Sequence, residues 1–252
     1  MKMRKLFAVA ALIAGSLVSA QSATAGDKIR IATEGAYAPF NMVDSNGELI
    51  GFDVEIAKAL CAEMKADCEI VAQDWDGIIP GLRARKYDAI IASMSITEER
   101  LRVVDFSEKY YSNVLAYVTK DGSNIEVTKA GLKGKTVGAQ RATIAGQFLE
   151  DNLGDVVDVK LYDTQDNAYL DLQAGRLDAL LSDKFPAFDW LRTEEGAGYA
   201  FTGEDIDIND EIGIAVRKGD ALSGKFSTAI KAIVADGTYA KINEKYFPFS
   251  IY

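Results

Sequence analysis

Three residues near the start of the chain have side chains that could bind a positively charged group. Glu34 and Tyr37 lie in the stretch TEGAYAPF, and Trp75 lies between two aspartates. A carboxylate forms an ion pair with a cation, and an aromatic face attracts one. Taken alone, each ring is more typical of core or surface packing, but all three residues follow strand-like runs, where binding residues are common. We therefore expect Glu34 to bind a guanidinium or ammonium head while Tyr37 covers an aliphatic stem.

Ser93, Ser95 and Arg100 form a second group, which could bind an anion. They follow a buried strand-like run, and Ser95 and Glu98 have the spacing of a capping box at a helix start. Free backbone amides at such a start bind anions, and the Arg100 guanidinium could grip a carboxylate through two hydrogen bonds. An ordinary capped helix with an exposed arginine is the alternative interpretation.

A third group lies in the second half of the chain. Gln140 and Thr143 stand in the stretch GAQRAT, where Thr143 is a suitable helix cap whose hydroxyl could face a cleft. Asp183 ends a buried strand-like run, so its carboxylate needs hydrogen-bond donors or a positive partner. A ligand ammonium would serve, although Lys184 or Lys135 could instead be a structural partner.

The composition excludes or disfavours several kinds of chemistry. The chain contains no histidine, which rules out serine or cysteine triads of the histidine type. Two cysteines, Cys61 and Cys68, cannot fill a tetrahedral zinc site and favour a local disulfide in an oxidising compartment, so we expect no metal and no cofactor. With 38 acidic and 28 basic residues, the net charge of −10 argues against nucleic acid or anionic lipid as partners. Solubility alone would explain most of this acidity.

The first 25 residues have the layout of a secretory signal peptide. Basic residues precede an apolar run at 6–14, and small residues end at Ala25. This pattern predicts cleavage after Ala25 and export of the remaining chain. An uncleaved anchor is the alternative, although the apolar run is short for a membrane span.

The elements that must position these side chains alternate between strand and helix. Strand-like runs at 28–33, 68–72 and 87–92 are separated by apolar residues at helical spacing. This order is typical of an α/β fold. A polar stretch at 121–129 is the predicted crossing to a second lobe, and the strand and helix series restarts at 136–139.

An internal echo favours two lobes of the same kind. KYDAIIAS at 86–93 matches RLDALLSD at 176–183 in residue type, although two buried strands could also match by chance. Each lobe would be a small doubly wound sheet with ligand groups at the carboxyl ends of its strands. A strand at 210–217 and two later helical segments could return to the first lobe. The expected division is a leader at 1–25, lobe 1 at 26–115 and 211–252, and lobe 2 at 116–210.

Several motifs together resemble a known family. The stretches TEGAYAPF, GFD at 51–53, DWDG at 74–77, SMSIT at 93–97 and DFS at 105–107 are similar to those of the periplasmic polar amino-acid-binding proteins of ABC importers. The resemblance covers essentially the whole chain after the leader and is strongest to the arginine/ornithine and lysine/arginine/ornithine branch. It implies a two-lobed periplasmic binding protein fold, a periplasmic location and a ligand in the cleft between the lobes.

The resemblance also implies roles for the candidate residues. It assigns Asp183 to the α-ammonium of the ligand and places the ligand side chain between Tyr37 and Trp75. The α-carboxylate would be held by Ser93, Ser95, Arg100 and Thr143. The expected ligand-binding set is completed by Glu34, Ala92 and Gln140, and the implied disulfide joins Cys61 to Cys68.

The chain departs from the family pattern at two positions. Binders of lysine, arginine and ornithine commonly carry aspartate where this chain has Glu34, and glutamine where it has Ala145. The preference among basic ligands therefore stays open.

The function expected from these observations is capture of a basic L-amino acid (arginine, ornithine or lysine). A monomer that performs no chemistry would deliver it to an inner-membrane ABC permease. Two alternatives stay open. A secreted cyclohexadienyl dehydratase, acting on prephenate or arogenate, has the same fold and would use Glu34 or Asp183 as its acid. A ligand sensor that docks on a signalling receptor is the other.

Overall fold

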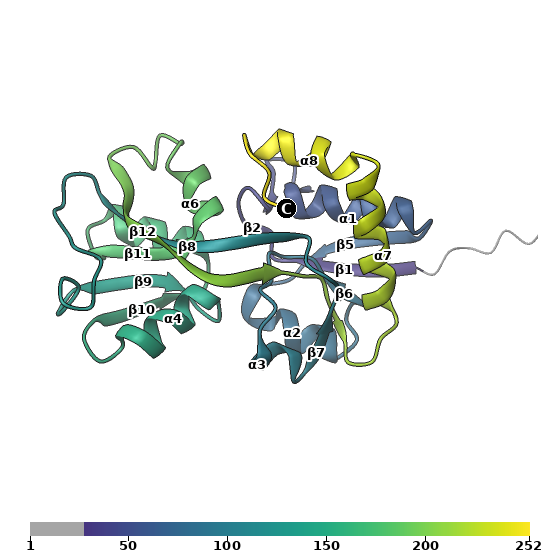
Figure 1. The fold of residues 1–252 in the computed structure, drawn as a ribbon, viewed down its shortest axis with the longest axis horizontal. Helices are drawn as coiled ribbons and strands as arrows, with labels where there is room; N and C mark the ends of the chain where they lie inside the picture. The colour runs from purple at the N-terminus through teal and green to yellow at the C-terminus, as the bar shows by residue number, and fades with distance from the viewer. Residues whose placement is uncertain (1–27) are drawn as a thin grey trace, which may run out of the picture.

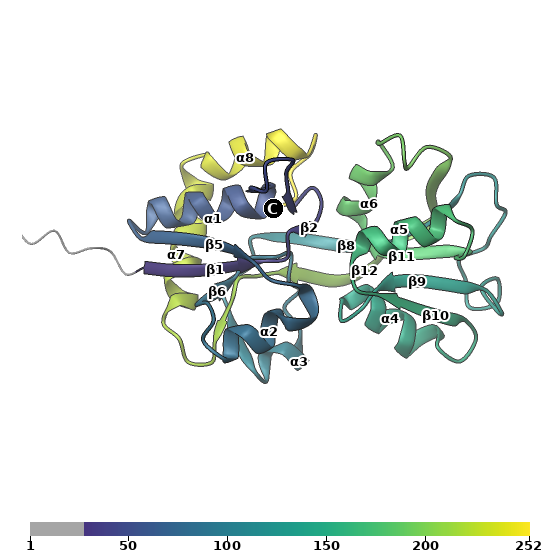
Figure 2. The same cartoon turned by 180° about the vertical axis from the view of Figure 1, so that it is seen from behind.

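Two lobes, each built around a five-stranded sheet, make up residues 28–252, the part of the chain that the computed structural model describes (Figures 1 and 2). The expected leader, residues 1–25, lies outside these residues. Helices pack on both faces of each sheet, so the predicted α/β class is confirmed.

The sheet of lobe 1 consists of β1 (Lys28–Thr33), β5 (Asp67–Ala72), β6 (Ala89–Ile90), β7 (Val104–Phe106) and β13 (Ala215–Arg217). Its strand order is β5-β1-β6-β13-β7. β1 pairs in parallel with β5 and β6, whereas β13 runs antiparallel to β6 and β7. The carboxyl ends of the three parallel strands therefore meet at one edge of the sheet.

Helices enclose this sheet because successive strand residues point to opposite faces. In β1, Ile31 packs in a core with α1 (Phe52–Glu63), α7 (Leu222–Ala235) and α8 (Thr238–Tyr246). The next residue, Ala32, packs on the other face with α2 (Trp75–Arg83). A short helix, α3 (Glu98–Leu101), and a small sheet complete the lobe; the small sheet comprises β2 (Ala36–Tyr37), β3 (Asn41–Val43) and β4 (Leu49–Ile50).

The sheet of lobe 2 has the same plan. It contains β8 (Tyr111–Lys120), β9 (Thr136–Gln140), β10 (Asp158–Tyr162), β11 (Ala179–Asp183) and β12 (Tyr199–Ile212), in the order β10-β9-β11-β8-β12. β9 pairs in parallel with β10 and β11, and β8 runs antiparallel to β11 and β12. The lobe's helices are α4 (Ile144–Leu153), α5 (Gln165–Gln173) and α6 (Lys184–Trp190).

The two similar segments, residues 86–93 and 176–183, contain strands at equivalent positions in the two sheets. β6 and β11 each lie third in the order of their sheets, next to β1 and β9 respectively. Ser93 follows β6 and Asp183 ends β11, so the two residues stand at matching places in the two lobes.

The connection between the lobes differs from the prediction. β8 and β12 themselves run from one lobe to the other (Figure 1). Tyr111, at the start of β8, packs in the core of lobe 1, and Leu115 packs in the core of lobe 2. The stretch 121–129 follows β8 within lobe 2, where Ile125 packs against the core, so it is not the crossing. The proposed boundaries at 115/116 and 210/211 fall inside these two long strands.

The strand predicted over 210–217 is divided. β12 ends at Ile212, opposite Tyr111, and β13 begins at Ala215 in the sheet of lobe 1. The strand is interrupted there because the chain leaves the sheet of lobe 2 and joins the sheet of lobe 1. Between the two strands, the Gly213 amide donates a hydrogen bond to the Met94 carbonyl.

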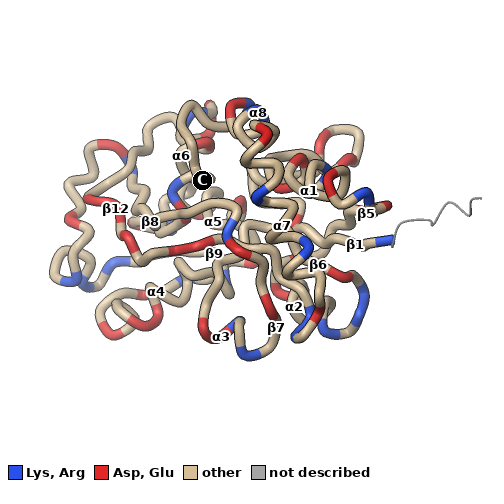
Figure 3. The backbone as a smooth tube through the Cα atoms, turned by 45° about the vertical axis from the view of Figure 1, so that its right-hand side comes forward, with Lys and Arg blue, Asp and Glu red and all other residues tan. Residues whose placement is uncertain are grey.

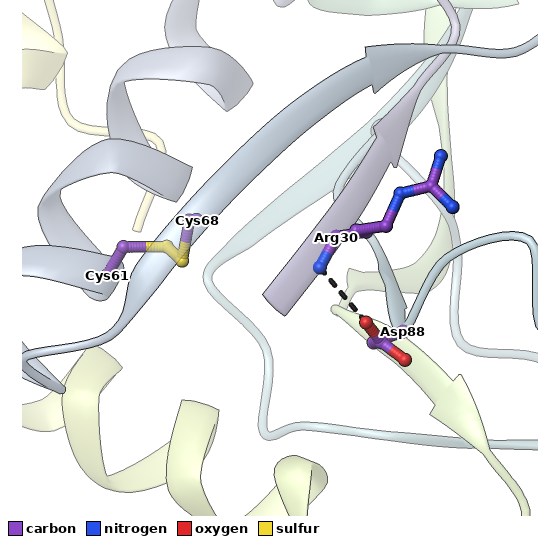
Figure 4. The surroundings of a disulfide bond; sticks show 4 residues. All are labelled: Arg30, Cys61, Cys68 and Asp88. Atoms are coloured by element: carbon purple, nitrogen blue, oxygen red, sulfur yellow. Dashed lines mark hydrogen bonds between the residues drawn. A yellow bond between two sulfur atoms is a disulfide. The ribbon is translucent and has the colours of Figure 1, made fainter. Parts of the chain in front are cut away.

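The predicted disulfide is confirmed. Cys61 on α1 and Cys68 on β5 are bonded, which fastens the helix to the sheet at a point away from the carboxyl end of β5 (Figure 4). On the other side of β1, the Arg30 amide donates to Asp88 Oδ2 at 3.0 Å (Figure 4). Within residues 28–252, no helix combines the length and the apolar character that crossing a membrane requires.

Candidate functional site

A cavity between the lobes collects all ten of the predicted ligand-binding residues. It contains about 270 Å³ of empty space, part of it open to solvent. Its lining comprises Glu34, Tyr37, Trp75, Ala92, Ser93, Ser95 and Arg100 from lobe 1, and Gln140, Thr143, Ile144 and Asp183 from lobe 2.

One lining residue, Ile144, was not predicted. It is the first residue of α4, directly after the cap Thr143. The neighbouring Ala145, at which the departure from the family pattern was placed, is buried in the core of lobe 2. Adjacent helix residues point about 100° apart, so a shift of one position decides which side chain faces the cavity.

The two lobes meet in a contact between Glu34 and Gln140. Gln140 Nε2 donates to Glu34 Oε1 at 2.7 Å and to the Asp163 carbonyl at 3.3 Å. Gln140 Oε1 is buried and accepts no hydrogen bond from residues 28–252. Burial raises the pKa of Glu34 to about 7 against the effect of the Gln140 hydrogen bond. This corner of the cavity therefore offers acceptor atoms and is suited to a cationic donor.

Asp183 is a second buried acid in the cavity. Tyr37 donates its hydroxyl to Asp183 Oδ2 at 2.7 Å, which joins lobe 1 to lobe 2. The other oxygen, Oδ1, is buried and finds no partner within the described residues. Burial, followed by the nearby charge of Asp210, raises the pKa of Asp183 to about 7. An ionised Asp183 would be stabilised by a positive group beside Oδ1.

The lysines considered as structural partners of Asp183 pair with other acids. Lys184 forms an ion pair with Asp205, and Lys135 forms one with Asp178 at 3.3 Å. Neither lysine is therefore an ion-pair partner of Asp183.

Arg100 brings the positive charge of the site and also bridges the lobes. Its Nη1 donates to the Ser95 carbonyl and its Nη2 to the Ala142 carbonyl in lobe 2, both at 2.9 Å. Its guanidinium carbon lies 5.4 Å from the centre of the Trp75 ring. A guanidinium has five N–H groups, so donors remain for a carboxylate.

The helix cap predicted at Ser95 lies elsewhere. Thr97 precedes α3 and accepts from the Arg100 amide at 3.2 Å, whereas Ser95 forms a β-bridge with Ile212. An anion site made of free backbone amides was expected at the start of this helix. α3 has only four residues, so it offers only a single short turn for such a site. The bridge to Ile212 holds Ser95 in an extended conformation. The spacing between Ser95 and Glu98 could not reveal this contact, because Ile212 is distant in the sequence.

The cap predicted at Thr143 is confirmed. Its hydroxyl accepts from the Gly146 amide at 3.2 Å and donates to the Gln140 carbonyl at 2.7 Å. The hydroxyl hydrogen is therefore used inside lobe 2, and the same contact fixes the backbone at Gln140.

The charges of the site are complementary to one class of small molecule. Two buried carboxylates, Glu34 and Asp183, and one arginine, Arg100, line the cavity. A ligand with two positive groups and one negative group would match them. Acidic residues are spread over both lobes, including a run along β12, and such a field attracts cations (Figure 3).

Comparisons with known families, sequences and solved structures all identify solute-binding or amino-acid-binding proteins as similar to this chain. Residues 29–249 match the bacterial extracellular solute-binding proteins, family 3. The L-arginine-binding protein of Pseudomonas aeruginosa PAO1 is 45% identical over 257 residues, covering 99% of each chain. The lysine/arginine/ornithine-binding periplasmic protein of Escherichia coli K12 is 36% identical, covering 99% of this chain and 98% of the relative. The solved structure of an ancestral arginine-binding protein bound to arginine has a TM-score of 0.83 and 38% identity, covering 88% of this chain and 99% of that one.

Proposed function

This chain belongs to the bacterial extracellular solute-binding proteins, family 3, and we propose that it captures a basic L-amino acid, namely arginine, ornithine or lysine. The observation that carries the proposal is the charge set of the cavity: two buried carboxylates and one arginine. A basic amino acid has the opposite set, with a cationic side chain, an α-ammonium and an α-carboxylate. Relatives named for binding arginine, lysine or ornithine support this choice.

The structure supports a definite orientation of the ligand. The α-ammonium would lie beside Asp183 Oδ1, and the side-chain cation would lie between Glu34 and Gln140 Oε1, because these acceptors are buried and need donors. The α-carboxylate would then be held by the remaining N–H groups of Arg100. Ala92, Ser93, Ser95 and Thr143 would form the wall around it, and Tyr37 and Trp75 would flank the side chain.

Ligand binding would stabilise the closed arrangement of the lobes. Polar contacts already cross between them, including Tyr37 with Asp183, Gln140 with Glu34, Arg100 with the Ala142 carbonyl and Arg141 with Asp76. A ligand that touches both lobes binds the closed state better than the open one and shifts the equilibrium towards it. Hinge bending would then occur in β8 and β12, the strands that join the lobes.

The closed form would be presented to a membrane permease of an ABC importer. This step fits an exported monomer that acts in the periplasm, a compartment in which the Cys61–Cys68 disulfide is stable. Cleavage after Ala25 would release the chain there.

One observation favours a second function. Glu34 and Asp183 both have pKa values raised to about 7, which suits a general acid. A cyclohexadienyl dehydratase would need such an acid beside the ring of prephenate or arogenate. The second acid and the aromatic residues are better explained by a cationic amino acid, so we prefer the binding function.

Calorimetric titration of refolded, ligand-stripped protein tests the choice. The titrants are arginine, ornithine, lysine, histidine, glutamine and prephenate. Ligand that remains bound from purification must be removed first, because it occupies the site and hides the binding of weaker titrants. Such a ligand at a thousandfold excess over its Kd stabilises the folded protein by about 4 kcal/mol. Binding of the basic amino acids alone would support the receptor and rank its ligands. Absence of that binding, with turnover of prephenate, would overturn the proposal in favour of the enzyme.

A further inference from the structure

Asp53 is a fully buried acid behind the binding cavity. It lies in the first turn of α1, is 0% exposed and is absent from the cavity lining. Its Oδ2 accepts from Asn41 Nδ2 at 2.9 Å and from Ser93 Oγ at 3.1 Å, and its Oδ1 accepts from the Tyr110 hydroxyl at 2.7 Å. A buried carboxylate is costly unless donors surround it, and three converge on this one.

Through Asn41, this carboxylate is connected to the loop that carries Glu34 and Tyr37. Asn41 Oδ1 accepts from the Gly35 amide at 2.7 Å while its Nδ2 donates to Asp53. Gly35 has a φ of +81°, a left-handed conformation that a glycine adopts at little cost. The loop is therefore anchored at its turning point, between the two residues that face the ligand.

On its other side, the same carboxylate holds Ser93. Ser93 lies in the cavity wall and has a φ of +50°, which is uncommon for a residue other than glycine. A serine hydroxyl has a single hydrogen. Because that hydrogen is donated to Asp53, the Ser93 oxygen can only accept towards the cavity. It is therefore prepared for an N–H group such as the α-ammonium, and the adjacent α-carboxylate would be held by Arg100 and not by the Ser93 hydroxyl.

We propose that Asp53 is a positioning residue of the binding site, which orients the Ser93 hydroxyl as an acceptor and anchors the loop of Glu34 and Tyr37. This inference rests on the proposed function, since it needs a ligand with N–H donors. Asp53 acts without touching the ligand, and its effect on affinity passes through Ser93 and Asn41.

The test compares Asp53→Asn, Ser93→Ala and the double variant by titration of ligand-stripped protein with arginine. The amide of Asp53→Asn keeps the shape but replaces the charged acceptor of the Asn41 and Ser93 donors with a neutral amide oxygen and turns a donor towards Tyr110, so the Ser93 hydrogen is held less firmly and can turn into the cavity. We expect a Kd about 10- to 100-fold higher, the size of one lost hydrogen bond to a charged group. In the Ser93→Ala background the same change should cost several-fold less, because interacting residues are not additive.

Asn243→Ala is the matched control for a purely structural effect. Asn243 is buried in lobe 1 and bonds to the Phe249 carbonyl and the Ile251 amide, in the C-terminal segment. We expect it to lower the melting temperature as Asp53→Asn does but to leave Kd within about twofold, since it holds no residue of the cavity. If Asp53→Asn does not fold, Asn41→Ser replaces it, because this change breaks the anchor of the loop and leaves Asp53 and Ser93 in place.

The outcomes separate this inference from the proposed function. A wild-type protein that binds no basic amino acid would overturn the proposed function itself. A wild type that binds arginine, with Asp53→Asn or Asn41→Ser at unchanged Kd, would overturn only the role of Asp53. Fully additive effects of Asp53→Asn and Ser93→Ala would also contradict it.

Discussion

Replacing Asp183 with asparagine should separate ligand affinity from stability. Asp183 is 7% exposed, its Oδ2 accepts from Tyr37, and its Oδ1 is without a partner among the described residues. In Asp183→Asn the amide oxygen can keep the Tyr37 contact, and the amide nitrogen then faces the ligand ammonium. A donor would meet a donor, and the ion pair would be lost.

The expected loss follows from the removal of one partner of a buried charge pair. Such truncations cost about 2–5 kcal/mol, which corresponds to a Kd for arginine about 30- to 4,000-fold higher. In the ligand-free protein, the same substitution should be stabilising. The pKa of Asp183 rises from 3.8 to about 7 on folding, so its ionisation destabilises the folded protein as pH increases from about 4 through 7. Without ligand, Asp183→Asn should therefore be more stable than the wild type at pH 8. This difference in the free energy of unfolding should shrink towards pH 4.

Titration calorimetry with arginine and thermal unfolding without ligand, each at several pH values, measure the two effects. Asp178→Asn is the matched control, because Asp178 lies just before the same strand and pairs with Lys135 outside the cavity. We expect it to lower stability slightly and to leave Kd unchanged. A folded Asp183→Asn protein that binds arginine as tightly as the wild type would refute the assignment of Asp183 to the ammonium.

Three further predictions concern the rest of the site and the disulfide. Glu34→Gln should weaken arginine binding by about 1.5–3 kcal/mol, because a hydrogen bond to a charged group is lost; equal affinity in calorimetry would contradict the role of Glu34. Affinity should rise from pH 5 to pH 8, since Glu34 and Asp183 have pKa values of about 7 in the ligand-free protein and must ionise to pair with a cation. Titrations at pH 6 in buffers of different ionisation enthalpy should accordingly detect proton release, and identical heats would argue against it. Replacing Cys61 and Cys68 with serine should lower the free energy of unfolding in urea by about 2–3 kcal/mol, from the entropy of a short closed loop. Arginine affinity should persist in that variant, because neither cysteine lines the cavity.

Local patterns determined much of this protein. Apolar periodicity predicts the alternation of strands and helices, because side chains repeat every second residue in a strand and about every 3.6 in a helix. Parallel strands in an α/β sheet place their carboxyl ends together, so Glu34, Ser93 and Asp183 could be recognised as candidates for one cavity. The Thr143 cap and the Cys61–Cys68 disulfide were also predictable, since both join residues close in the sequence.

Other features depended on contacts between distant segments. The cap at Thr97, the crossing through β8 and the position of Ile144 in the cavity all differ from the local expectation. In each case pairing or packing with another part of the chain decides between conformations that the local sequence allows about equally.

The partners of the buried polar groups were decided by the tertiary structure alone. Tyr37 and Asp183 are 146 residues apart in the sequence, and Glu34 and Gln140 are 106 apart. Spacing cannot reveal that Lys184 pairs with an acid other than Asp183. The residue types in the chain specify which charges and hydroxyls the site contains. Only the packing of the two lobes decided which atoms satisfy one another and which are left for a ligand, because a buried donor or acceptor must find its partner among the groups that folding brings to it.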